Sequence, residues 1–284
     1  MSRRANAIPG GPASRRAAEP RAEDFGTSGN ISEASGTSIF DPVLCELAYR
    51  WFAPSGGVVI DPFAGGSVRG IVASVLGLRY IGIDLSQRQV AANIIQAKRI
   101  CRKAPAPRWI VGDSHRIDSL IPREITADLI FSCPPYADLE RYSDDTADLS
   151  TMDYPSFLVA YRAIIAAACA RLTDNRFACF VVGDIRDRAG MYRGFPSDTI
   201  AAFRDAGLHL YNEAILVTAV GSLSIRVGKQ FVSGRKMGKT HQNVLVFFKG
   251  DPKQIRKDFP ATCEFGDLVG DDVLSTDGVN TGAV

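Results

Sequence analysis

Short apolar runs alternate with helical patterns through the middle of this chain, and this alternation most constrains the fold. Each run is bounded by Gly, Pro or Asp, as is typical of buried parallel strands. The runs are 58–60, 80–83, 109–111, 128–131 and 177–182. Between some of them lie helical patterns at 87–102, which follows the N-cap residue Ser86, at 154–172, and at 196–206, which Gly207 ends.

Two further apolar runs, 211–218 and 244–248, follow with no helix expected between them, which indicates an antiparallel pair. The pattern predicts an α/β fold, a doubly wound and mostly parallel sheet of seven strands with a C-terminal antiparallel hairpin. In such sheets the ligand lies at the carboxyl ends of the strands, so residues at the strand ends are expected to carry the chemistry.

The composition supports one folded domain with irregular ends. The 284 residues are 46% hydrophobic and 23% charged, with a net charge of +2 that argues against a polybasic protein coating nucleic acid by charge alone. We expect a disordered arm at 1–37, a domain at 38–250 and an acidic tail at 251–284. With no apolar run of membrane-spanning length and no signal peptide, a cytoplasmic protein with reduced cysteines is expected, without a membrane or an obligate protein partner.

The first three strand ends indicate a nucleoside pocket. The first strand runs into Asp61-Pro62-Phe63-Ala64-Gly65-Gly66-Ser67, which is neither a GxGxxG fingerprint nor a Walker A loop. Its glycines allow close approach of a ligand to the backbone. Asp84 ends the second strand and suits a pair of ribose hydroxyls, and Asp113, followed by Ser114, ends the third and suits an adenine amino group.

The fourth strand ends in Cys133-Pro134-Pro135-Tyr136. The two prolines fix the backbone just beyond a buried strand and leave carbonyls outside the regular ladder. A rigid acceptor carbonyl beside an aromatic face suits a flat heterocycle that carries an NH₂ group.

These two motifs resemble those of the S-adenosylmethionine-dependent amino-methyltransferases of DNA, the N6-adenine and N4-cytosine group. The cofactor motif DPF-x-G-S-G is similar to 61–67, and the catalytic motif [DNS]-P-P-[YFW] is similar to 133–136. The motif order is gamma-like, the likeness spans about 38–250, and the stretch from 211 to 244 looks most like stand-alone enzymes of phage type, as found in restriction-modification.

The resemblance implies S-adenosylmethionine as cofactor and a methyltransferase (Rossmann-like) sheet. It places Phe40 and the segment 38–42 over the methionine end of the cofactor, and Asp61, Phe63, Gly65 and Gly66 around its methionine part. Asp84 then holds the ribose, and Asp113 with Ser114 the adenine. Cys133 and the Pro134 carbonyl face the target amine, beside Pro135, and Tyr136 stacks on the flipped base.

Two positions depart from the family pattern. Ser67 replaces the second glycine of the cofactor motif, and Cys133 stands where the family has Asp, Asn or Ser. Sulfur is a weak acceptor, so Cys133 is expected to bind an N–H of the target amine less well than oxygen does. A cytosine-C5 mechanism is disfavoured because that family uses Pro-Cys, whereas here Cys precedes Pro-Pro.

A basic segment between the last two strands is the expected DNA contact. Residues 219–242 hold Arg226, Lys229, Arg235, Lys236 and Lys239 and no carboxylate, as suits a flexible loop that follows phosphates. The acidic stretch 137–151 is interpreted as a solvated lid and not as a metal site. Two alternatives remain: methylation of RNA or of a protein amide, and a DNA- or nucleoside-binding protein whose activity is weakened by Cys133.

Overall fold

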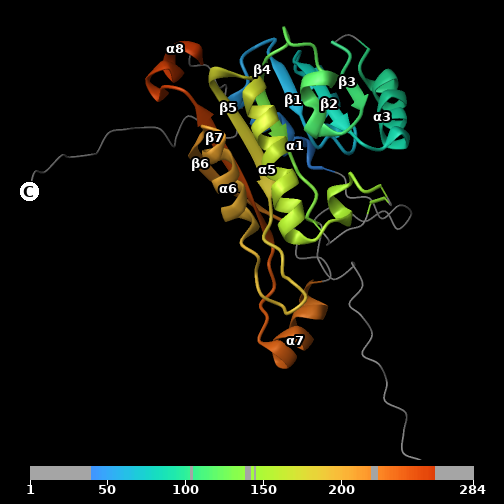
Figure 1. Cartoon of the computed structure of the whole chain (residues 1–284), viewed down its shortest axis with the longest axis vertical. Helices are drawn as coiled ribbons and strands as arrows, with labels where there is room; N and C mark the ends of the chain where they lie inside the picture. The colour runs from blue at the N-terminus through green and yellow to red at the C-terminus, as the bar shows by residue number, and fades with distance from the viewer. Residues whose placement is uncertain (1–39, 103–104, 138–141, 144, 219–222, 260–284) are drawn as a thin grey trace, which may run out of the picture.

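The computed structural model describes residues 40–102, 105–137, 142–143, 145–218 and 223–259. They contain a seven-stranded sheet in the order β3-β2-β1-β4-β5-β7-β6 (Figure 1). The strands are β1 (Val58–Asp61), β2 (Arg79–Asp84), β3 (Arg108–Val111), β4 (Ala127–Ser132), β5 (Leu172–Val182), β6 (His209–Val217) and β7 (His241–Lys249).

The first five strands are parallel, and β7 pairs antiparallel with both β5 and β6. The predicted doubly wound, seven-stranded sheet with its antiparallel closing pair is therefore confirmed. Because β1 to β5 run the same way, their carboxyl ends meet at one edge of the sheet. Asp61, Asp84 and Ser132 each end a strand at this edge.

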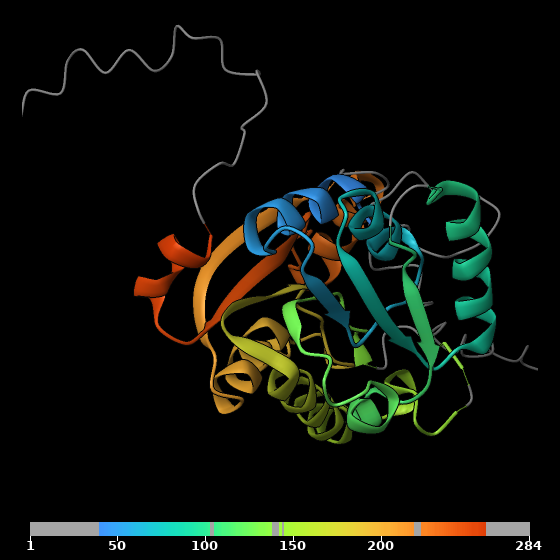
Figure 2. The same ribbon diagram turned by 90° about the horizontal axis from the view of Figure 1, so that it is seen from above.

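Helices cover both faces of the sheet (Figure 2). α1 (Pro42–Phe52), α2 (Val68–Val75) and α3 (Gln87–Ile100) contribute to one apolar cluster. α4 (Ile117–Leu120), α5 (Tyr154–Arg171) and α6 (Phe195–Asp205) contribute to the other. The strands are apolar because side chains on both of their faces pack against these layers.

Local signals in the sequence account for several helix ends. Ser86 caps α3 by accepting a hydrogen bond of 3.2 Å from the Gln89 N–H, as predicted. Gly207 follows α6 with a φ of +84°, a left-handed conformation that glycine adopts at little cost. Cys45, Cys169 and Cys179 are buried thiols, as their apolar surroundings in the sequence indicate.

The segment between β6 and β7 corrects one prediction, because it contains the helix α7 (Leu223–Gly234) where none was expected. Figure 1 shows α7 at the far end of an extension below the sheet, reached through the chain that leaves β6 and returns into β7. The basic segment is therefore a helical protrusion in part and not simply a flexible loop.

After β7 the chain continues as the short helices η5 (Pro252–Gln254) and α8 (Ile255–Asp258). Ile255 and Phe259 pack against the apolar cluster beneath α1 to α3. The described chain thus continues in short helices past residue 250, and the predicted domain bounds remain a prediction. Residues 1–39 and 260–284, which include most of the predicted arm and tail, lie outside the described residues. Within the described part, no helix has both the length and the apolar character of a membrane span.

Candidate active site

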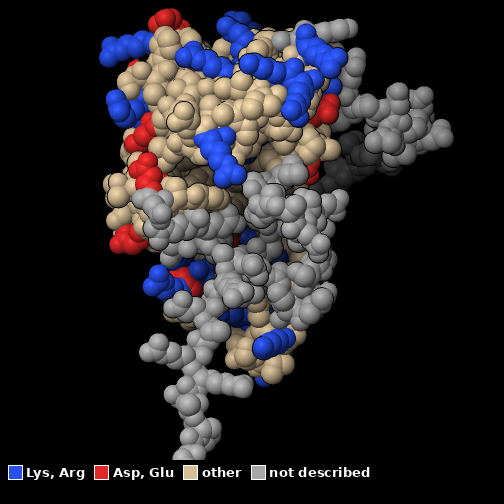
Figure 3. All heavy atoms as spheres, turned by 90° about the vertical axis from the view of Figure 1, so that its right-hand side faces the viewer, with Lys and Arg blue, Asp and Glu red and all other residues tan. Residues whose placement is uncertain are grey.

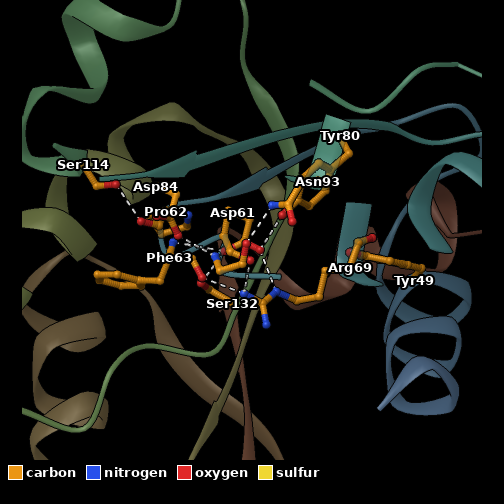
Figure 4. Close-up of polar contacts among 12 residues, drawn as sticks. Tyr49, Asp61, Pro62, Phe63, Arg69, Tyr80, Asp84, Asn93, Ser114 and Ser132 are labelled. Carbon is orange, nitrogen blue, oxygen red and sulfur yellow. Dashed lines mark hydrogen bonds and ion pairs between the residues drawn. The ribbon is translucent and has the colours of Figure 1, made fainter. Parts of the chain in front are cut away.

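Asp61, at the end of β1, is a buried anchor of the site (Figure 4). Its Oδ2 accepts hydrogen bonds from Arg69 Nε at 2.6 Å and from the Tyr80 hydroxyl at 2.7 Å. Its Oδ1 accepts from Ser132 Oγ at 2.5 Å and from the Phe63 N–H at 3.1 Å. With no exposed surface and four partners, Asp61 organises the strand ends, and its predicted contact with a cofactor remains a prediction.

Arg69 links this anchor to the loop that follows β1. Its Nη2 donates to the carbonyls of Phe63 and Ala64 at 2.6 and 2.9 Å, so it fixes the backbone just before the two glycines. The ring of Phe40 lies over the Arg69 guanidinium, 4.7 Å from ring centre to Cζ, and edge-on to Phe131. Phe40 therefore packs beside the glycine loop, while residues 38 and 39 of the predicted covering segment lie outside the described residues.

The glycine turn itself is open to a ligand. Gly65 has a φ of +49°, and a side chain placed at Gly65 or Gly66 would meet no other atom within 4 Å. Asn93 donates to the Gly65 carbonyl at 2.7 Å and holds the turn from α3. The turn thus presents backbone to open space while its shape is fixed from behind, which is how a backbone cradle for a ligand is built. Phe63, at the start of this loop, packs against Tyr161 and Phe180.

Asp84, at the end of β2, lies beside this turn. Its Oδ2 accepts from the Gly65 N–H at 2.8 Å and its Oδ1 from the Ser86 N–H at 2.7 Å. A carboxylate oxygen can accept two hydrogen bonds, so each of these oxygens retains acceptor capacity. Burial raises the pKa of Asp84 above its ordinary value of 3.8, while the two backbone N–H donors act in the opposite direction.

The end of β3 is tied to the same loop. Ser114 is buried, and its Oγ donates to the Pro62 carbonyl at 2.6 Å. The neighbouring Asp113 is partly exposed and caps η2 (Ser114–Arg116) by accepting from the His115 N–H at 2.9 Å. Both residues are predicted to hold an adenine. The Asp113 carboxylate is partly open to solvent, whereas the buried Ser114 hydroxyl supports the loop after β1.

The Cys133–Tyr136 motif follows β4, the direct neighbour of β1. The Tyr136 hydroxyl accepts a hydrogen bond of 2.8 Å from Gln242 Nε2, and it also hydrogen-bonds with the Cys133 side chain and the Gly183 N–H. The ring of Tyr136 lies nearly perpendicular to that of Phe195, with centroids 6.0 Å apart. Its predicted stacking on a base remains a prediction. Ala137 follows with a φ of +50°, a costly conformation for a residue with a side chain.

Burial, followed by the nearby Cys133, raises the pKa of Tyr136 well above its usual range. The phenol therefore remains protonated at neutral pH. Since the Gln242 amide and the Gly183 N–H are donors to the phenolic oxygen, the O–H of Tyr136 is the group that can donate to the Cys133 side chain. Sequence reasoning did not single out Gln242, because only the fold brings the start of β7 to the end of β4.

The acidic stretch 137–151 is only partly described, since Asp138, Glu140 and Asp144 lie outside the described residues. Asp148 is buried, accepts from Ser143 Oγ at 2.7 Å, and caps η4 (Leu149–Thr151) through the Ser150 N–H. The stretch is therefore packed at 148–150, although residues 142, 143, 145 and 146 are exposed. Among the described residues, no three His, Cys, Asp or Glu side chains are grouped to hold a metal.

The predicted DNA-binding residues fall into two groups. Lys229 is exposed on α7, whereas Arg235, Lys236 and Lys239 lie on the chain that returns toward β7. The side chain of Arg226 lies outside those that the structure describes. Figure 3 shows basic side chains on the upper body as well as on the protrusion below it, so positive charge is not confined to the protrusion.

Several solved structures are similar to this chain at low sequence identity. TrmN from Thermus thermophilus is 17% identical with a TM-score of 0.48, over 74% of this chain and 49% of that one. Magnesium protoporphyrin IX methyltransferase from Synechocystis, solved with bound SAM, is 11% identical with a TM-score of 0.47, over 74% of this chain and 79% of that one. An rRNA methylase from Streptococcus thermophilus is 9% identical with a TM-score of 0.46, over 76% of this chain and all of that one.

The chain thus spans about half the length of TrmN. No model of a known protein family matches the sequence. No curated protein matches it either.

Proposed function

We propose that this protein is an S-adenosylmethionine-dependent methyltransferase that modifies an exocyclic amine of a DNA base, N6 of adenine or N4 of cytosine. One observation carries the proposal. The open Gly65–Gly66 turn, bound to Asp84, and the Cys133–Tyr136 motif follow adjacent strands at the same edge of the sheet. A nucleoside pocket and a site for a flat, amine-bearing ring are therefore neighbours.

The residues at the first three strand ends fit the proposed cofactor. The open glycine turn has room for a ligand against its backbone, and Asp84 retains acceptor capacity for ribose hydroxyls. Asp113 offers a partly exposed carboxylate for an adenine amino group. When bound, S-adenosylmethionine supplies an electrophilic methyl group, so the protein is required mainly to hold the reacting groups in line.

The chain's own task at the target is to accept the N–H groups of the amine and so localise its lone pair on nitrogen. The Pro134 carbonyl is one acceptor, because proline fixes its orientation beyond β4. The second acceptor is the Cys133 side chain, which hydrogen-bonds with the Tyr136 hydroxyl. The ring of Tyr136 packs in a T-shaped contact with Phe195, and Gln242 holds its hydroxyl, so the ring can serve as a rigid wall for a base.

DNA is the favoured substrate because Lys229, Arg235, Lys236 and Lys239 belong to the protrusion that carries α7. These basic side chains can contact the phosphates of a duplex directly. Incubation of the purified protein with methyl-tritiated S-adenosylmethionine and three acceptors (unmethylated DNA, RNA of matched sequence, and a protein mixture) tests the assignment. We expect the label in DNA, and none with Tyr136→Ala protein that still binds the cofactor. Label found only in RNA or only in protein would show that the same site acts on another class of substrate.

A further inference from the structure

A cavity of about 340 Å³ lies between the chain that follows β5 and the chain that leads into β7. Figure 1 shows the segment between β5 and α6 running beside the extension that carries α7. The polar and aromatic lining residues are Asp184, Arg186, Tyr192, Arg235, Lys239 and His241. Three of them are cationic and one is a carboxylate, so the cavity favours an anion.

The first wall is preformed. Arg186 and Tyr192 form an isolated antiparallel bridge, and Arg186 Nη1 donates to the Gly190 carbonyl at 2.8 Å. The Arg186 guanidinium lies 3.8 Å from the centre of the Tyr192 ring. This stacking holds the charged group in place, and a guanidinium has several N–H donors, so others remain for a ligand.

The second wall comes from the returning chain. Arg235 has a φ of +51°. The end of the Lys236 side chain lies close to Gly190, and a Cβ atom added to Gly190 would be only 2.6 Å from Lys236 Nζ. The two walls are therefore in contact. Burial lowers the pKa of Lys239, against an opposing effect of Asp184. A partly desolvated ammonium of this kind gains more from a bound anion than one in open water.

The carboxylate in the lining is already engaged. Asp184 Oδ1 accepts from the N–H groups of Ile185, Gly194 and Phe195 at 2.9, 2.9 and 3.2 Å, and thereby fixes the start of α6. Asp184 still attracts Lys239, so this one carboxylate balances part of the positive charge of Arg186, Arg235 and Lys239. The lining therefore keeps an excess of positive charge.

The cavity adjoins the proposed target site on both walls. Asp184 directly follows Gly183, and His241 directly precedes Gln242. Gly183 and Gln242 are two of the residues that hydrogen-bond with the Tyr136 hydroxyl. Two lining residues, Asp184 and His241, are therefore each next in the chain to a residue that holds the Tyr136 hydroxyl.

We propose that this cavity binds one phosphate group of the DNA strand that presents the target base. This assignment rests on the proposed function and adds Arg186 and Tyr192 to the basic residues of the protrusion. Binding a single phosphate beside Tyr136 fixes the register of the strand, so that the neighbouring nucleotide is the one extruded toward the motif.

The salt dependence of DNA binding tests this assignment, because its slope counts the phosphates that are neutralised, at about 0.9 per phosphate for duplex DNA. Affinity for a fluorescein-labelled duplex is measured over a series of NaCl concentrations for the wild type, Arg235→Gln, Lys239→Gln and the double variant. Lys253→Gln, an exposed lysine in η5, removes one charge elsewhere and is the matched control. Arg186→Gln, whose fold is checked by its melting temperature, probes the first wall.

If the cavity holds one phosphate, each variant lowers the slope by at most about one, the double variant lowers it by about one in total, and the control leaves it unchanged. An unchanged slope in the double variant, or a fall of about two, would overturn the single-phosphate site. Tritium transfer to DNA by the wild type is measured in parallel, so that the cavity can fail while the proposed function stands. Binding of matched RNA in preference to DNA, lost in the same variants, would overturn the DNA assignment.

Discussion

The side-chain amide of Gln242 donates a 2.8 Å hydrogen bond to the hydroxyl of Tyr136, which lies 106 residues earlier in the chain. The bond joins the start of β7 to the motif that follows β4, and β5 lies between these two strands. The antiparallel strand that closes the sheet therefore also positions the aromatic residue of the proposed target site.

Replacing Gln242 by Leu should lower the rate of methyl transfer by roughly fivefold, since the loss of one hydrogen bond is worth about 1 kcal/mol. Affinity for S-adenosylmethionine should not change, because Gln242 does not contact the glycine turn. Asn243→Leu removes the neighbouring amide, which bonds to the exposed Glu213 at 2.7 Å, and serves as the control. Equal rates of methyl transfer in Gln242→Leu and Asn243→Leu would show that Gln242 has no particular role in the reaction.

Cys133→Ser should raise the rate of methyl transfer, because a hydroxyl oxygen accepts an N–H far better than a thiol does. We expect an increase of about tenfold in kcat with an unchanged Kd for the cofactor, measured by single-turnover transfer of labelled methyl. Activity that appears only in the Ser variant would identify the native chain as a binding protein of weakened activity. A drop in kcat would instead show that the thiol itself is required.

Cofactor affinity should depend on the protonation of Asp84. Because burial raises its pKa, this carboxylate takes up a proton at a pH above 3.8, and the neutral form accepts hydrogen bonds less well. Calorimetry should show affinity falling as the pH drops through this raised pKa, and Asp84→Asn should bind weakly at every pH. The same shift has the opposite effect on the ligand-free fold, whose stability falls as the pH rises through this window. A pH-independent affinity would remove Asp84 from the ribose site.

The buried pair of Asp61 and Arg69 should dominate the stability of the strand ends. Asp61→Ala leaves the Arg69 guanidinium buried without its partner, and such changes cost about 3–5 kcal/mol in the free energy of unfolding. The control is Glu46→Ala, which removes an exposed pair with Arg50 of similar length, 2.8 Å, and should cost less than about 1 kcal/mol. Urea denaturation measures both, and similar losses would contradict the anchor role.

Much of the fold is readable from the sequence because the strands are short apolar runs that end in Gly, Pro or Asp. The helix α7 was missed although Leu223, Val227 and Phe231 recur at a spacing of four residues. Gly228 and the surrounding basic residues concealed this period. The pairing of β7 between β5 and β6 depends on contacts between distant segments, which no local pattern specifies.

The residues at the strand ends of the candidate site were predictable from the sequence. The residues that hold Asp61 and Tyr136 in place were not. The residues that hold Asp61 come from three separate elements, and their meeting follows from the register of the sheet. One signal was present, since Arg69 is the lone charge in the otherwise uncharged helix α2. For Tyr80, Ser132 and Gln242, the sequence offers no such signal.

The most direct test of the account is nucleoside mass spectrometry on DNA from a methylation-deficient host that expresses this protein, with the Tyr136→Ala protein as control. We predict N6-methyladenine or N4-methylcytosine in DNA from cells with the wild type and neither base in the control. Unmodified DNA, from cells in which the wild type is folded and binds S-adenosylmethionine, would contradict the account.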